Sequence, residues 1–255
     1  MKEKIKRYTK FLILFLTIIC AIIAVRSGIF LEKKDLHKEN FVNLSMTEFL
    51  VDSCDTGVNC DETAVPIVES SASGFIVWKL DGLSYILTAG HFCNHEIVEN
   101  YSFLGFSIKS EVTISDFQSI DHDAEIIFID DSSDLCLLRS TIKRDIKTIR
   151  FSSMPKIGEK VYAISSPLGI SENGVLLHFD GFFSGCDDIG LCYYTIPATS
   201  GSSGSIVFDR AGYVIGMIQM TPTHFRSVSL GVGSPDILSF LRDASDHLKI
   251  NLIPF

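Results

Sequence analysis

The feature that most limits the folds open to this chain is a series of short apolar runs, several of them β-branched or aromatic, with turn residues between them. From about Pro66 onward these runs recur at similar intervals, over residues 74–78, 84–89, 106–114, 124–129, 135–138, 160–164, 174–183, 191–196, 205–208 and 213–218. Such a pattern is typical of antiparallel sandwiches and barrels and not of alternating βαβ units. The sequence therefore predicts an all-β body over residues 66–255.

One segment near the end of the chain departs from this pattern. In residues 234–248, Ile237, Leu238 and Leu241 recur at helical spacing. Ser234 can cap the helix and Pro235 suits its first turn. The spacing predicts a C-terminal helix.

The overall charge limits the possible partners. Hydrophobic residues make up 46% of the 255 residues, which is enough for a substantial core. The net charge is −9, and no basic stripe stands out in the body of the chain. Nucleic-acid binding is therefore not expected.

The first thirty residues resemble an export segment. Residues 1–10 contain five basic residues and one acidic residue, and residues 11–25 are uncharged and apolar. Arg26 interrupts the apolar run, which continues weakly to Leu31. A positive start followed by an apolar run is typical of secretory signals, and the positive end stays inside.

This pattern favours an uncleaved transmembrane signal anchor over residues 11–31, with residues 1–10 as a basic cytoplasmic tail. Residues 32–65 are polar and are expected to form an irregular stalk. The body would then be membrane-anchored and lie in the periplasm or outside the cell. Two alternatives stay open: a cleaved signal peptide, which would release a secreted protein, and a buried core helix, which the lysines at its start disfavour.

Six cysteines follow this segment, and an even number in an exported chain fits an oxidising compartment. Cys186 and Cys192 bracket a short loop rich in Asp and Gly, and Cys54 and Cys60 bracket another. We expect these two pairs to form disulfides, although six cysteines allow other pairings. A zinc site is disfavoured because no CxxC or HxxxH spacing is present.

Two residues at strand ends are candidates for acid–base chemistry. His91 directly follows the apolar run 84–89, so a strand end would hold it rigidly while leaving it accessible. Asp134 precedes the apolar run 135–138, where a partly buried carboxylate needs a hydrogen-bonding partner. Each residue alone fits an ordinary surface or turn position as well. Asp123 is a weaker competitor for the buried role, and Asp130 with its neighbour Asp131 fits a solvated turn.

The stretch of small residues in "ATSGSSGSIVFD", residues 198–209, has two interpretations. It could be a flexible linker, but the apolar runs that follow it indicate a buried hairpin. A tight turn fixed by core strands is therefore favoured, with Gly201 and Gly204 allowing unusual backbone angles. In such a turn Ser203 would be a nucleophile, and the N–H groups of Gly201 and Ser203 could stabilise an oxyanion.

The order His, Asp, Ser in an all-β chain is a more specific signal than any one of the three residues. With this order the chain resembles the trypsin-like (chymotrypsin-fold) serine proteases. The nearest likeness is to the bacterial HtrA/Deg and V8-type exported proteases. The resemblance is carried by "SASGFIV", "YILTAGH", "DLCLL", "SSPLG", "GFFSG", "GSSGS" and "GYVIGMI", and it covers residues 66–242. Too few residues follow the predicted helix for a PDZ module, so an HtrA-like regulated chaperone-protease is not expected.

The resemblance implies two six-stranded antiparallel β-barrels with an active site between them. It also implies that Ser203 attacks the scissile carbonyl, that His91 transfers the proton, and that Asp134 orients His91. Gly201 and Ser203 amides would form the oxyanion hole. The substrate would be a protein or peptide, and no metal or cofactor would be needed.

Departures from the family pattern bear on specificity. Pro197 stands six residues before the nucleophile, where trypsin has an aspartate, and Ile218 takes the place of the V8-type histidine that binds a substrate glutamate. The resemblance places substrate-binding residues at Pro197, Thr199, Ile218, Gln219 and Met220, with Thr221 beside them. The bulk of these side chains favours a small or medium apolar side chain at the cleavage site.

Three further departures concern activation and the cysteines. Ser202 replaces the family's usual Asp or Asn, which argues against activation by a new N-terminus. Cys93 does not match the position of the animal enzymes' bridge, and Cys136 fits a buried free thiol.

The sequence therefore predicts a membrane-tethered serine endopeptidase. The alternative is a trypsin-like fold that has lost catalysis and serves as a binding module.

Overall fold

The computed structural model describes residues 10, 13–19, 37–52, 64–94 and 106–252. The chain divides into two units, Met1–Asp35 and Leu36–Phe255. In the first unit, residues 13–19 are helical. Within the described ranges, no helix has the length and apolar character needed to cross a membrane. Most of the predicted anchor over 11–31 and of the basic tail lies outside the described residues, so the anchor stays a prediction.

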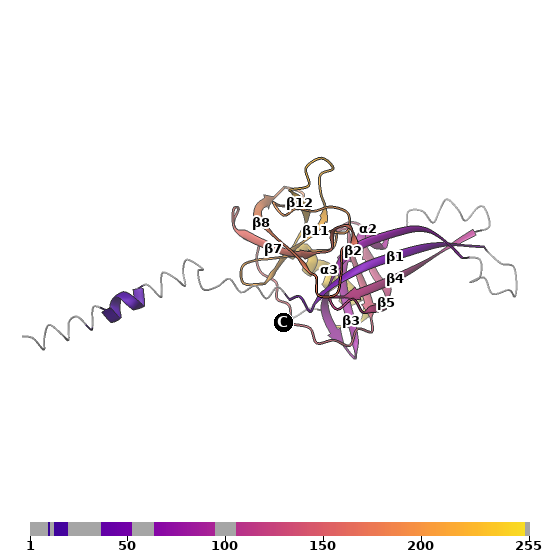
Figure 1. Ribbon diagram of the computed structural model, residues 1–255, viewed down its shortest axis with the longest axis horizontal. Helices are drawn as coiled ribbons and strands as arrows, with labels where there is room; N and C mark the ends of the chain where they lie inside the picture. The colour runs from indigo at the N-terminus through magenta and orange to yellow at the C-terminus, as the bar shows by residue number, and fades with distance from the viewer. Residues whose placement is uncertain (1–9, 11–12, 20–36, 53–63, 95–105, 253–255) are drawn as a thin grey trace, which may run out of the picture. The chain divides into compact units, whose positions relative to one another are not determined.

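The second unit contains two closed antiparallel barrels (Figure 1). The first barrel is built from β1 (Phe41–Asp52), β2 (Val65–Leu80), β3 (Leu83–Ala89), β4 (Phe106–Asp116), β5 (Asp121–Asp130) and β6 (Leu135–Ser140). Its strands close in the order β1-β2-β3-β6-β5-β4. In Figure 1, β1, β2 and β4 extend together well beyond the shorter strands of the barrel, with β1 paired to both of the others.

Strand β1 shows that the predicted stalk over 32–65 is wrong for residues 41–52. These residues pair with β2 on one side and β4 on the other, and so close the barrel. Their side chains alternate, with Val42, Leu44 and Met46 buried in the core while the residues between them are more exposed. That alternation is the pattern of a half-buried strand, and the interleaved polar residues make it resemble a polar connector.

The second barrel is built from β7 (Lys160–Ser165), β8 (Leu177–Cys186), β9 (Cys192–Tyr194), β10 (Ile206–Phe208), β11 (Val214–Met220) and β12 (Ser229–Gly233). Its strands close in the order β10-β11-β12-β9-β8-β7. The sequence pattern does not indicate β12, "SLGVG", because its short side chains give no β-branched or aromatic run. The prediction of two six-stranded antiparallel barrels is confirmed.

Helix α3 (Ser234–Leu248) confirms the predicted C-terminal helix. Its buried face consists of Ile237, Phe240, Leu241 and Ala244. This face joins a core cluster that also contains Leu135 from the first barrel and Phe208 from the second, so the helix helps to hold the barrels together. Ser234 is not the predicted cap, because Gly233 takes the cap position and the Ser234 hydroxyl donates to the Ser152 carbonyl instead.

A buried ion pair joins Arg144, in the segment after β6, to Asp116 at the end of β4. Arg144 Nη1 lies 3.2 Å from Asp116 Oδ2, and the side chains are only 13% and 4% exposed. The guanidinium also donates to the Glu39 carbonyl and lies 4.1 Å from the centre of the Phe117 ring. Burial lowers the pKa of Arg144, while the nearby Asp116 carboxylate opposes that shift. Loss of either charge is therefore expected to lower the stability of the fold strongly, because the other charge would stay buried.

Asp116→Ala is expected to lower the free energy of unfolding by about 3–5 kcal/mol, because buried Arg144 would lose its nearest counter-charge and the N–H groups of Gln118 and Ile120 would lose their acceptor. Urea denaturation followed by tryptophan fluorescence measures the change. Glu125→Ala is the matched control, since it breaks the exposed Arg139–Glu125 pair, whose side chains are 40% and 63% exposed. A loss of only about 0–1 kcal/mol is expected there. Equal losses in the two variants would contradict a special role for the buried pair.

Candidate active site

His91 lies on α2 (Gly90–Cys93), a four-residue helix that directly follows β3. Its neighbours Phe92 and Cys93 are buried in the first barrel, while its own side chain is 52% exposed. The strand end therefore fixes the backbone of His91 and leaves its imidazole accessible to a substrate.

Asp134 occupies the turn directly before β6, the strand that pairs with β3. Because Ala89 pairs with Leu135, the end of β3 and the start of β6 lie side by side. The His91 Nδ1 atom is 2.9 Å from Asp134 Oδ2 and 3.1 Å from Oδ1, and the His91 backbone N–H donates to Oδ1 at 2.6 Å. The sequence-predicted His–Asp pair is thus brought together by the strand register.

The Asp134 backbone adopts a left-handed conformation, with φ of 51°. Asp tolerates this region better than most residues, but the surrounding structure must hold it there. Part of that support comes from Asp130, whose carboxylate accepts hydrogen bonds from the Ser132 and Ser133 hydroxyls. These bonds, led by that from Ser132, lower the pKa of Asp130 and keep the turn organised.

The loop before β10 forms a tight turn and not a flexible linker. Gly201 and Gly204 both have φ of 86°, and a Cβ at Gly204 would overlap the Ser73 carbonyl oxygen. The Gly204 N–H donates to the Ile218 carbonyl at 2.8 Å, which ties the turn to β11. Glycine is therefore required at these two positions by conformation and by close approach.

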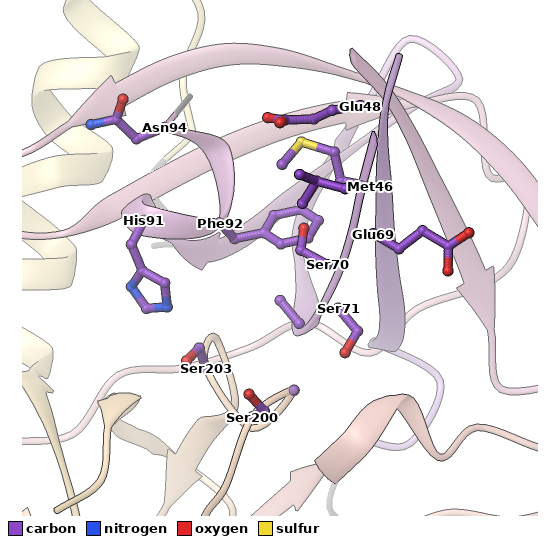
Figure 2. Close-up of a pocket in the computed structure, with 13 residues that line it drawn as sticks. Met46, Glu48, Glu69, Ser70, Ser71, His91, Phe92, Asn94, Ser200 and Ser203 are labelled. Carbon is purple, nitrogen blue, oxygen red and sulfur yellow. The ribbon is translucent and has the colours of Figure 1, made fainter. Parts of the chain in front are cut away.

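Ser203 lies on the same cavity as His91. This cavity has a volume of about 600 Å³ and extends from Gly201 and Ser203, past His91 and Phe92, to Met46 on β1. In Figure 2 the His91 ring extends from α2 toward the loop that carries Ser203. The Ser203 hydroxyl donates to the Gln219 carbonyl at 2.9 Å, and no hydrogen bond joins it to His91 in the described structure. Rotation about the Ser203 Cα–Cβ bond redirects the hydroxyl, a motion on the ps–ns timescale for an accessible side chain.

The N–H groups of Gly201 and Ser203 have no acceptor within the described part of the chain. The carbonyls next to them are held elsewhere, since the Ser200 carbonyl accepts from Leu168 N–H at 2.6 Å and the Gly201 carbonyl accepts from the Ser73 hydroxyl at 2.9 Å. Leu168 belongs to the short helix η4 (Pro167–Gly169). Gly201 and Ser203 line the same cavity, and two amides that are free to donate there can stabilise a developing negative charge.

Ser73 is a residue that the sequence analysis missed. It lies on β2 in the first barrel, yet its N–H donates to the Ser203 carbonyl at 2.8 Å and its hydroxyl donates to Gly201. The same hydroxyl accepts from Ser166 N–H at 2.9 Å. Ser73 therefore fixes the nucleophile loop of one barrel against the other. The signal in "SASG" is two small polar residues, which is too common a pattern to single out.

Gln219 is buried, and its amide Nε2 donates to the carbonyls of Ser133 and Asp134 at 2.6 and 2.7 Å. It thus supports the Asp134 turn from the second barrel.

The other predicted substrate-binding residues lie in different settings. Ile218 is packed in the interior of the second barrel, whereas Met220 is 49% exposed and Pro197 is exposed. The Thr199 hydroxyl accepts a hydrogen bond from Arg226 at 3.0 Å.

Two disulfides lie within the described residues. Cys186–Cys192 is the predicted bridge. Cys93–Cys136 is a second bridge, so the expectation of a free Cys136 thiol is wrong. These two residues are far apart in sequence, and only the pairing of β3 with β6 brings them together. The predicted Cys54–Cys60 pair lies outside the described residues.

Ser73→Ala is expected to lower kcat for peptide hydrolysis by about tenfold with KM within about twofold, because small displacements of catalytic groups cost rate. Leaving Ser166 N–H and the Gly201 carbonyl without their partner is also expected to cost about 1–3 kcal/mol of stability. Ser84→Ala is the control, since this buried serine donates to the Ile142 carbonyl within the first barrel. Comparable loss of kcat in both variants would contradict the assignment.

The comparisons with known proteins agree with this arrangement. Residues 72–217 match the trypsin-like peptidase domain, and this match covers more than half of the chain. No curated protein matches the chain. The nearer likeness to HtrA/Deg or V8-type proteases stays a prediction. The matched residues extend from β2 to β11 and include His91, Asp134 and Ser203. The chain therefore belongs to the family of trypsin-like peptidase domains.

Proposed function

We propose that this protein is a serine endopeptidase that uses Ser203, His91 and Asp134 as its catalytic residues. The observation that carries the proposal is the meeting, at one cavity, of a hydrogen-bonded His–Asp pair, a serine on a tight turn and two free amides. Proteins and peptides are the expected substrates, as family membership supports.

The proposed reaction begins with rotation of the Ser203 hydroxyl from the Gln219 carbonyl toward His91. Because His91 Nδ1 faces Asp134, Nε2 is the nitrogen left to accept the proton as Ser203 Oγ attacks the scissile carbonyl. The carbonyl oxygen takes up negative charge and accepts hydrogen bonds from the Gly201 and Ser203 amides. His91 then gives its proton to the leaving amine, and an acyl-enzyme remains on Ser203.

The second half of the reaction uses the same groups. His91 accepts a proton from water as the water oxygen attacks the acyl carbon, and the oxyanion is again stabilised by the two amides. Return of that proton to Ser203 Oγ releases the carboxylic acid product. Asp134 orients the imidazole and stabilises its charged form throughout.

Cleavage of an unfolded protein tests this proposal. Incubation with casein, followed by mass spectrometry of the products, is expected to yield new peptides with the wild-type protein and none with His91→Ala. His224→Ala, at an exposed loop histidine, is the matched control and is expected to cleave normally. Cleavage by the His91→Ala variant at the wild-type rate would refute the proposal.

A catalytically inactive binding module is the second candidate function. The hydrogen bond from Ser203 to the Gln219 carbonyl, in place of one to His91, favours it. Stable binding of a folded protein or peptide without any cleavage, and without labelling by a fluorophosphonate, would support this alternative over the endopeptidase.

For cleavage-site preference, we propose that the substrate has a small or medium apolar side chain at the cleaved position, as the bulk of Met220 and Thr221 predicts. Arg226, which donates to Thr199, would instead favour an acidic side chain. Digestion of a peptide library separates the two, since dominance of acidic or basic residues at the cleaved position would end the apolar proposal.

We also propose that the N-terminal segment exports the protein, so that the peptidase domain works outside the cytoplasm. Support comes from the basic start and the apolar run in residues 1–31. Sequencing of the mature N-terminus distinguishes an uncleaved anchor, which begins at Met1, from a cleaved signal, which begins later. A full-length protein recovered only from the cytoplasmic fraction would contradict export.

A further inference from the structure

The Cys93–Cys136 disulfide is placed symmetrically with respect to the His–Asp pair. Cys93 follows His91 by two residues, and Cys136 follows Asp134 by two residues. Both pairs are therefore separated by the same 43 residues, and the bridge joins the two segments that carry the acid–base groups.

The bridge lies in the interior of the first barrel. Cys93 is the last residue of α2, and Cys136 is the second residue of β6, where it pairs with Thr88 of β3. Their exposed fractions are 1% and 0%, and both belong to the core cluster that contains Phe92. The disulfide thus anchors α2 to β6 from inside the barrel, while the His–Asp pair lies at the accessible side.

The His–Asp pair needs such support for two reasons. The His91 side chain is 52% exposed, so packing does little to fix its ring. Asp134 has a left-handed backbone, which the surrounding structure must maintain. The other links between the two segments are hydrogen bonds, among them Gly90 N–H to the Asp134 carbonyl at 2.8 Å. Hydrogen bonds alone permit small displacements that a covalent tie restricts.

We propose that Cys93–Cys136 is a positioning bridge, which holds the His91 imidazole in hydrogen-bonding register with the Asp134 carboxylate. This inference rests on the proposed function for its kinetic consequences. The geometric consequence, a fixed His91–Asp134 hydrogen bond, does not depend on activity. The bridge acts through His91 and Asp134 and does not itself contact substrate.

Removal of each described disulfide in turn tests the proposal. The variants are Cys93→Ala/Cys136→Val, which retains apolar volume, and Cys93→Ala/Cys136→Ala. The matched control is Cys186→Ala/Cys192→Ala, which removes the bridge between β8 and β9. Loss of the positioning bridge is expected to lower kcat by about 10–100-fold with KM within about twofold, because misplaced catalytic groups lose rate and not binding. The control is expected to stay within about twofold in both constants.

Proton NMR gives the readout that does not need activity. In wild type and in the control, the His91 Nδ1–H proton, which is donated in the hydrogen bond to the Asp134 carboxylate, is expected to give a low-field resonance. In the two bridge variants this resonance is expected to broaden or disappear. If both variants fail to fold, the same spectra are recorded on the Cys186→Ala/Cys192→Ala protein before and after reduction with a phosphine, so that Cys93–Cys136 is the described disulfide that changes.

A purely structural role would give a different result. Equal falls in melting temperature for the bridge variants and the control, with kcat and the low-field resonance unchanged, would overturn the proposal. If the wild-type protein cleaves no peptide, the proposed function is refuted. If the low-field resonance is still lost in the two bridge variants, the positioning role is supported all the same.

Discussion

Ser203→Ala, His91→Ala and the double variant are each expected to lose about the same factor in kcat, on the order of 10⁶, when peptide hydrolysis is measured. The nucleophile and its base act as one unit, so removal of either leaves the other with no function to perform. A residual rate above that of water is expected in all three, because the Gly201 and Ser203 amides and the substrate-binding surface remain. Steady-state kinetics with an internally quenched peptide, on extensively purified variants, gives the three values.

Ser202→Ala serves as the control for this comparison. Ser202 is buried next to the nucleophile, and its hydroxyl accepts from Thr199 N–H at 3.2 Å. Its loss disturbs the loop without touching the proton-transfer pair, and a drop in kcat of less than about a hundredfold is expected. A His91→Ala variant that keeps a tenth or more of wild-type kcat would contradict the claim that Ser203 and His91 act together as one catalytic unit.

Asp134→Asn is expected to lower kcat by about 10⁴ at neutral pH while the fold is preserved. Asn also tolerates the left-handed backbone at this position, and its Oδ1 can still accept from the His91 backbone N–H. Its NH₂ group, however, donates to His91 Nδ1 and so stabilises the wrong tautomer, in which Nε2 carries the proton. Nε2 can then no longer accept the proton of Ser203.

Kinetics combined with circular dichroism measures the effect of Asp134→Asn and checks the fold. Asp131→Asn is the matched control, because Asp131 lies in the same turn and accepts only from the Asn94 side chain in the described structure. That variant is expected to stay within about threefold of wild type, as exposed substitutions of this kind usually do. Similar losses in both variants would show that the turn as a whole, and not the Asp134 carboxylate, matters.

The fold was predictable where an element carries a continuous apolar run or apolar residues at helical spacing. The core strands β3 and β6 have such runs, and the helix α3 has the helical spacing. Strand β1 has neither, because polar residues interleave with its buried Val42, Leu44 and Met46. A stalk was therefore predicted where β1 in fact closes the barrel. Alternation of apolar and polar residues is a weaker signal for a strand than a continuous apolar run.

The candidate site was predictable only for those residues whose type and position indicate a catalytic role. His91, Asp134 and Ser203 are conspicuous by type and by position at strand ends. Ser73 is not, and Gln219 was singled out only as a substrate-binding residue and not for its support of the Asp134 turn. The roles of these two residues lie in contacts over 128 and 85 residues of sequence, which only the packed barrels create.

The Cys93–Cys136 bridge was missed for a similar reason. Neither cysteine lies in a short Cys-to-Cys loop, and the pairing of β3 with β6 determines the partner. Likewise, the sequence did not indicate that the Ser203 hydroxyl rests on the Gln219 carbonyl, because a side-chain rotamer depends on its three-dimensional surroundings.

Mapping of the covalent adduct formed with a fluorophosphonate tests the central claim most directly. The loop offers several serines, including Ser200, Ser202 and Ser205, but only Ser203 is expected to react, because His91 can take up its proton. Mass spectrometry of the digested, labelled protein is expected to find a stoichiometric adduct on Ser203 and none on its neighbours. A folded protein that stays unlabelled, or an adduct that forms on another serine, would contradict the account.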